Sequence, residues 1–148
     1  MNVGNTGRRG HQQRIAILWI CIGLFFLRVI GQVEVLLLSP PWLPPMNDWY
    51  SGLLPYPLLL PAQIALLMLM SVLVVREMRT EGLAFARPER WRTWVRRFAL
   101  VYFVVMVSRL AIQLFRGADD VIAAGGIPVA FHWVLALFLL VLSRTDRH

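Results

Sequence analysis

Strongly polar side chains interrupt the long apolar stretches of this 148-residue chain. They are Arg28, Gln32, Glu34, Gln63, Arg109, Gln113 and His132. An ionisable group inside a bilayer costs roughly 2.5–3.5 kcal/mol on insertion scales, so such groups usually pair with one another or mark a functional site. Guanidinium and amide groups donate hydrogen bonds to phosphate, carboxylate and carbonyl oxygens. The set therefore predicts a ligand-binding site for an anionic or carbonyl-bearing head.

Two arginine–glutamine pairs have the spacing of one helix face. Arg28 and Gln32 are four residues apart, as are Arg109 and Gln113, so each pair shares a face. Glu34 lies about 120° round the helix from Arg28, so it is not a simple intrahelical partner of that arginine. Two arginines against one glutamate leave a positive charge, which a lipid phosphate or a carboxylate would balance.

Other kinds of chemistry lack the residues that they need. A bis-histidine haem needs two facing histidines, whereas only His132 lies in an apolar stretch, and His11 and His148 lie in the tails. Zinc and iron sites need more ligands than His132 and Glu34 provide. Ser108 has no general base placed beside it, and no phosphate-binding loop or dinucleotide glycine pattern occurs. We therefore expect no catalytic residues, no metal and no cofactor.

Composition indicates that the elements carrying these residues cross a membrane. Hydrophobic residues make up 58% of the chain and charged residues only 16%, against about 25% charged in soluble domains. A membrane-spanning helix needs about 20 mostly apolar residues. Four stretches qualify, at about residues 15–38, 57–75, 98–115 and 127–143. The sequence thus predicts an all-α fold, a four-helix transmembrane bundle that forms a single integral membrane domain over residues 1–148.

The polar residues of the four spans should lie at similar depth. At about 1.5 Å per residue from the expected outer ends, Arg28 is roughly 16 Å deep and Arg109 roughly 10 Å. The other five residues of the set lie at roughly 5–10 Å on the same count. A structural alternative is that these groups only hold helices together through hydrogen bonds worth about 0.6 kcal/mol each. On that alternative, Arg109 extends to the outer headgroups.

Arginine placement predicts the orientation of the spans. All fifteen basic residues are arginines, the formal net charge is +7, and most of them flank the inner ends of the expected spans. Positive charges mark the cytoplasmic side. We therefore expect both termini and the basic loop 76–97 in the cytoplasm and the proline-rich loop 39–56 outside. The absence of lysine is typical of GC-rich bacterial genomes, which favours a bacterial plasma membrane, and the charge needs no nucleic-acid partner.

Aromatic and basic residues are expected at both membrane–water boundaries. The outer loop supplies Trp42, Trp49 and Tyr50, and the inner boundary has Trp91, Trp94, Arg96 and Arg97. Tryptophan and tyrosine favour this boundary, and arginines beside it attract anionic phospholipid heads. Pro88 should start a helix that continues into the third span.

The function that the sequence favours is non-enzymatic. We expect a multi-pass membrane protein that binds an amphiphile through the polar set, or an accessory or assembly subunit of a larger membrane complex or homo-oligomer. One alternative is a small proton-coupled transporter that uses Glu34 or His132 as the proton carrier. A second is a lipid-modifying membrane enzyme with His132 as the base and arginines on the phosphate.

Overall fold

The computed structural model describes residues 3–38, 56–79, 89–116 and 125–144, which form four helices. These are α1 (Val3–Leu38), α3 (Tyr56–Arg79), α4 (Glu89–Phe115) and α5 (Gly126–Ser143). Each is long and apolar enough to cross a membrane, by length and composition. The prediction of an all-helical chain with four candidate spans is therefore confirmed.

Two helices begin earlier than the apolar stretches that revealed them. Helix α1 starts at Val3 rather than near residue 15, because an established helix gains one hydrogen bond for each residue added, and no proline interrupts this polar segment. Helix α4 starts at Glu89, directly after Pro88, as expected from that proline. Pro128 lies in the first turn of α5, where its missing N–H is tolerated.

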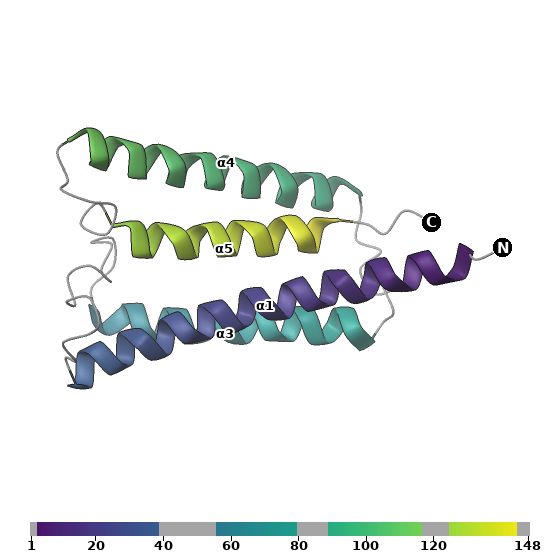
Figure 1. The fold of residues 1–148 in the computed structure, drawn as a ribbon, viewed down its shortest axis with the longest axis horizontal. Coiled ribbons are helices and arrows are strands. Elements are labelled where there is room, and N and C mark those ends of the chain that lie inside the picture. The colour runs from purple at the N-terminus through teal and green to yellow at the C-terminus, as the bar shows by residue number, and fades with distance from the viewer. Residues whose placement is uncertain (1–2, 39–55, 80–88, 117–124, 145–148) are drawn as a thin grey trace.

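The helices are arranged as an open row in the order α3, α1, α5, α4 (Figure 1). Neighbours in the row run antiparallel, α3 packs only on α1, and α4 packs only on α5 among the described helices. The sequence predicted a four-helix bundle but no order of neighbours within it. The spans are apolar on all sides, so their hydrophobic pattern does not determine which helices become neighbours.

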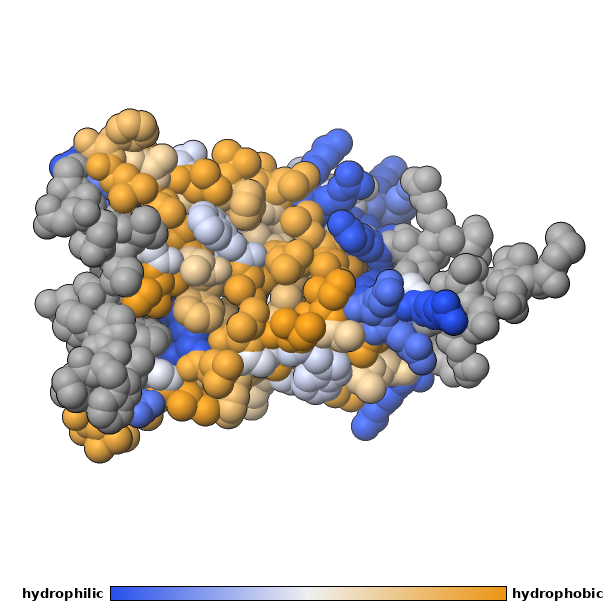
Figure 2. Space-filling model, in the orientation of Figure 1, coloured by the Kyte–Doolittle hydropathy of each residue, from blue (hydrophilic) through white to orange (hydrophobic). Residues whose placement is uncertain are grey.

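The start of α1 and the end of α5 lie at the same end of the row (Figure 1). We call this the proximal end, where α1 and α4 begin and α3 and α5 finish, and the opposite one the distal end. Toward the distal end, α1 and α4 diverge from α5. Figure 2 shows a wide apolar band on the visible face and a hydrophilic collar at the proximal end.

The apolar core joins α1, α3 and α5. Leu18 and Cys21 of α1 are almost fully buried among Met70 and Val74 of α3 and Phe138 of α5. These side chains anchor the central helix α1 on both sides. Helix α4 buries little of its surface, with only two buried residues, and presents the rest to its surroundings. Such exposure is typical of a helix that faces lipid or another membrane protein.

Candidate functional site

Gln32 and Gln63 form a buried hydrogen bond between α1 and α3. Gln63 Nε2 donates to Gln32 Oε1 over 3.0 Å, and both side chains are at least 94% buried. The remaining amide nitrogen of Gln32 and the remaining oxygen of Gln63 have no partner. Exchanging both amide assignments leaves the same result, one spare donor and one spare acceptor. This bond is a contact of the kind expected if the polar groups only hold the helices together.

Arg28 lies one helical turn from Gln32 and extends toward α5. Its guanidinium carbon is 5.3 Å from the centre of the Phe131 ring, and the residue is only 8% exposed. Its Nε has no hydrogen-bond partner, and no ion pair with another described residue offsets its charge. In Figure 2, hydrophilic atoms interrupt the apolar band in the region between α5 and α1. Within the described ranges, this nearly buried cation thus contacts the aromatic ring of Phe131.

Glu34 does not serve as the counter-charge to the arginines. It is half-buried on α1, and the described residues include no ion-pair partner for it. The sequence had allowed Glu34 to offset one of the two positive charges. The structure brings Glu34 into no contact with Arg28 that would do so.

His132 of α5 contacts α4 through Tyr102, a residue that the sequence analysis did not single out. The Tyr102 hydroxyl lies 2.5 Å from His132 Nδ1, and the two rings meet edge to face at 5.6 Å. This leaves Nε2 as the ring nitrogen for any further contact. A tyrosine hydroxyl inside an apolar stretch needs a partner, and that was the signal available in the sequence.

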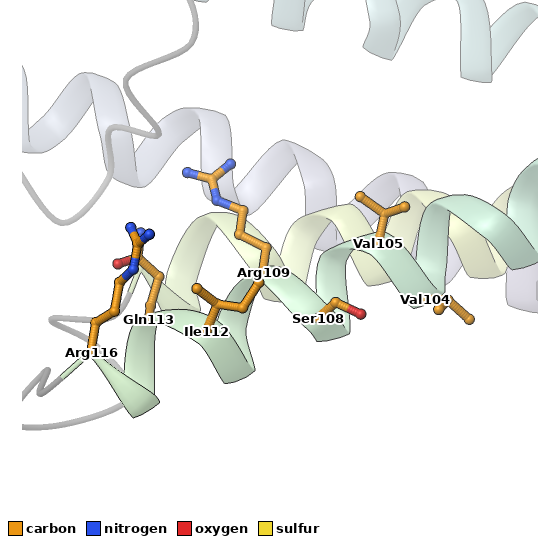
Figure 3. Close-up of a pocket in the computed structure, with 7 residues that line it drawn as sticks. All are labelled: Val104, Val105, Ser108, Arg109, Ile112, Gln113 and Arg116. Carbon is orange, nitrogen blue, oxygen red and sulfur yellow. The ribbon is translucent and has the colours of Figure 1, made fainter.

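A hollow of about 420 Å³ runs along the distal half of α4 (Figure 3). It is lined by Val104, Val105, Ser108, Arg109, Ile112, Gln113 and Arg116. In Figure 3 the side chains of Arg109, Gln113 and Arg116 point to the same side of the helix, and Arg109 leans toward the end where Arg116 lies. Two predicted site residues therefore line the hollow. Arg116 escaped the sequence analysis because it lies just beyond the apolar stretch.

A second polar cluster, at the proximal end, was also missed. Arg14 of α1 forms a buried ion pair with Glu77 of α3, and its Nη1 donates to the Arg144 carbonyl oxygen over 2.7 Å. Arg92 of α4 donates from Nε and Nη2 to the Ser143 carbonyl at 3.3 and 3.2 Å. Two guanidinium groups thus satisfy carbonyls at the C-terminal end of α5, where the helix dipole favours cations. These arginines join all four helices.

The predicted boundary residues at the proximal end lie at the surface. Trp91, Trp94, Arg96 and Arg97 are all exposed on α4. Trp42, Trp49 and Tyr50 lie outside the described residues. Exposed indole and guanidinium groups at one level are suited to a membrane–water boundary.

No group of three or more His, Cys, Asp or Glu side chains in the described part of the chain could hold a metal ion. The chemistry of the distal groups is instead that of hydrogen-bond donors around an anion. Comparison with protein-family models, with curated proteins and with solved structures found no match.

Proposed function

We propose that the chain is a multi-pass membrane protein that binds the anionic head of an amphiphile at the distal end of α1, α5 and α4. The observation that supports this function best is Arg28, a cation that is more than nine-tenths buried and lacks an anionic partner among the described residues. Burying an ion costs several kcal/mol even after the protein relaxes, whereas a desolvated cation–π contact contributes about 2 kcal/mol. A bound anion would remove that imbalance.

The order of the helices supports a site shared between two arginines. Helix α5 lies between α1 and α4, which do not contact each other. Arg28 lies on α1, on one side of α5, where it contacts Phe131, and Arg109 lies on α4, on the other side. An anion held here would contact Arg28 directly, with His132 Nε2 and the spare amide group of Gln32 as further donors. Gln63 would keep its role of fixing Gln32.

The proximal end is proposed to face the cytoplasm of a bacterial cell. Exposed arginines gather at that end on α3, on α4 and directly after α5, namely Arg76, Arg79, Arg90, Arg96, Arg97 and Arg144. Positive charge next to a span favours the cytoplasmic side. The distal site would then open toward the outer leaflet of the plasma membrane.

A second candidate function is proton-coupled transport. The hydrogen bond between Tyr102 and His132 favours it, because a phenol and an imidazole inside a membrane can relay a proton. On this proposal, uptake into liposomes would depend on a pH gradient and would be lost in His132→Asn. Gradient-independent flux in the variant and the wild type alike would remove His132 from such a mechanism.

The binding proposal is tested by retention of lipid through purification. The full-length protein, extracted in a mild detergent, is analysed by native mass spectrometry together with Arg28→Leu and Arg28→Lys. We expect an anionic lipid on the wild type, at least a tenfold loss with Arg28→Leu, and partial retention with lysine, which keeps the charge.

Arg90→Leu is the matched control, because Arg90 is an exposed arginine of the proximal end. It should retain as much lipid as the wild type. Equal retention by Arg28→Leu and the wild type would refute the proposed site. Constant association with one larger membrane complex, without bound lipid, would instead support an accessory subunit.

A further inference from the structure

We infer that the hollow on α4 is where a phosphate-headed lipid of the outer leaflet docks. The phosphate would lie at Arg109, Gln113 and Arg116, and an acyl chain would follow Val105 and Val104. The inference rests on the proposed function and names its ligand class and its route of entry.

The head end of the hollow is a stripe of donors on one helix face. Val105, Arg109, Gln113 and Arg116 follow one another at intervals of four, four and three residues, which places them on one side of α4. Figure 3 shows the three polar side chains pointing to that side together. Guanidinium groups bind phosphate oxygens in a two-pronged geometry, and the amide adds a further donor. This end therefore suits a phosphate group.

The rest of the hollow indicates a lipid rather than free phosphate. Val104 and Val105, which line its deeper end, are 59% and 52% exposed. Arg116 is twelve residues beyond Val104, which corresponds to about 18 Å along the helix. One leaflet of the hydrocarbon core is about 15 Å thick. A lipid with its head at the distal end would thus reach the membrane midplane beside Val104.

Charge indicates that the head is anionic. Two arginines line the hollow, and no acidic residue does so among the described residues. Arg109 lies two helical turns along α4 from Tyr102, which contacts His132 of the proposed site. A volume of about 420 Å³ lies within the range of about 300–1,000 Å³ typical of ligand pockets.

Photo-cross-linking in liposomes tests the inference. The full-length protein is reconstituted with phosphatidylglycerol that carries a diazirine on its acyl chain, and in parallel with the same probe on phosphatidylcholine. After irradiation, peptide mass spectrometry locates the adducts. We expect adducts within residues 104–112, at least fivefold more with phosphatidylglycerol than with phosphatidylcholine, and no competition by excess inorganic phosphate.

Three variants make the result specific. Val105→Trp fills the apolar end of the hollow and should reduce labelling at least fivefold, whereas Val101→Trp adds the same ring at an exposed position outside the lining and should leave it unchanged. Arg116→Gln should reduce the preference for phosphatidylglycerol. Size-exclusion chromatography verifies that each variant is folded.

The outcomes separate this inference from the proposed function. Labelling that is equal for both lipids, or unchanged by Val105→Trp and Arg116→Gln, would overturn the α4 site. If Arg28→Leu still loses its retained lipid in that case, the proposed function stands without it. If α4 is labelled in a lipid-selective way but Arg28→Leu loses nothing, the hollow is the binding site and the role given to Arg28 is wrong.

Discussion

Replacing Arg28 by leucine should stabilise the lipid-free protein, and this advantage over the wild type should shrink or reverse when ligand is present. Arg28 is 8% exposed and contacts the Phe131 ring at 5.3 Å, without an anionic partner among the described residues. Burying such an ion costs several kcal/mol, and the ring contact contributes about 2 kcal/mol in return. Leucine removes both terms, so we expect the free energy of unfolding to rise by about 1–3 kcal/mol.

Bound ligand should reverse this order. A ligand present at one hundred times its dissociation constant stabilises a protein by about 2.7 kcal/mol, provided that it binds only the folded state. Wild type would gain this increment and Arg28→Leu would not. The two stabilities should therefore converge or cross as anionic lipid is added to the micelles.

The assay is reversible unfolding in mixed micelles, followed by tryptophan fluorescence at increasing fractions of phosphatidylglycerol. Arg28→Lys serves as a second variant that keeps the charge, and Arg90→Leu as the exposed control. A lipid-free Arg28→Leu protein that is several kcal/mol less stable than the wild type would refute the reasoning. That result would mean that Arg28 already has its counter-charge within the folded chain.

Three further predictions concern the other polar contacts and the orientation. Gln63→Leu should lower the free energy of unfolding by about 1 kcal/mol, because it leaves the Gln32 amide unpaired. Adding Gln32→Leu removes that amide and should restore part of the stability. Additive losses in the double-mutant cycle would contradict this. Glu77→Gln should lower the free energy of unfolding by about 3 kcal/mol, because Arg14 then stays buried and charged. Replacing both Arg14 and Glu77 by leucine should lower it less. An unchanged stability of Glu77→Gln would show that the ion pair contributes nothing. On a Cys21→Ser background, Asn47→Cys should react with an impermeant maleimide added outside intact cells; labelling only after lysis would invert the proposed orientation.

The number and approximate limits of the helices follow from local properties of the sequence. Apolar stretches of about 20 residues locate the spans, and Pro88 and Pro128 locate helix starts, because their effects depend only on the neighbouring backbone. The extension of α1 back to Val3 was not foreseen. Hydropathy detects the part of a helix that fits the bilayer and is insensitive to a polar continuation.

The neighbours within the row and the partners of the polar groups depend on contacts between distant segments. Depth alone placed Gln32 and Gln63 at one level, but their hydrogen bond requires that α3 pack on α1. Tyr102 and His132, thirty residues apart, meet only because α4 packs on α5. Glu77 lies near the end of α3, and its ion pair with Arg14 forms only because α1 packs on α3. A single sequence carries no signal for such pairings when every span is apolar all round.

The place of α5 has a consequence for how the protein is made. Among the described helices, α5 alone connects α4 to the rest, and it follows the other three along the chain, so it is synthesised after them. Before Gly126 is synthesised, α1 and α3 can pair as a hairpin, whereas α4 has no helix to hold it. We therefore expect α5 to insert between two helices that are already in the bilayer, where Arg14 and Arg92 donate to the carbonyls at its C-terminal end. A chain truncated within α5 would have no helix to hold α4 beside α1. Arg28 of α1 and Arg109 of α4 would then no longer lie on the two sides of one helix.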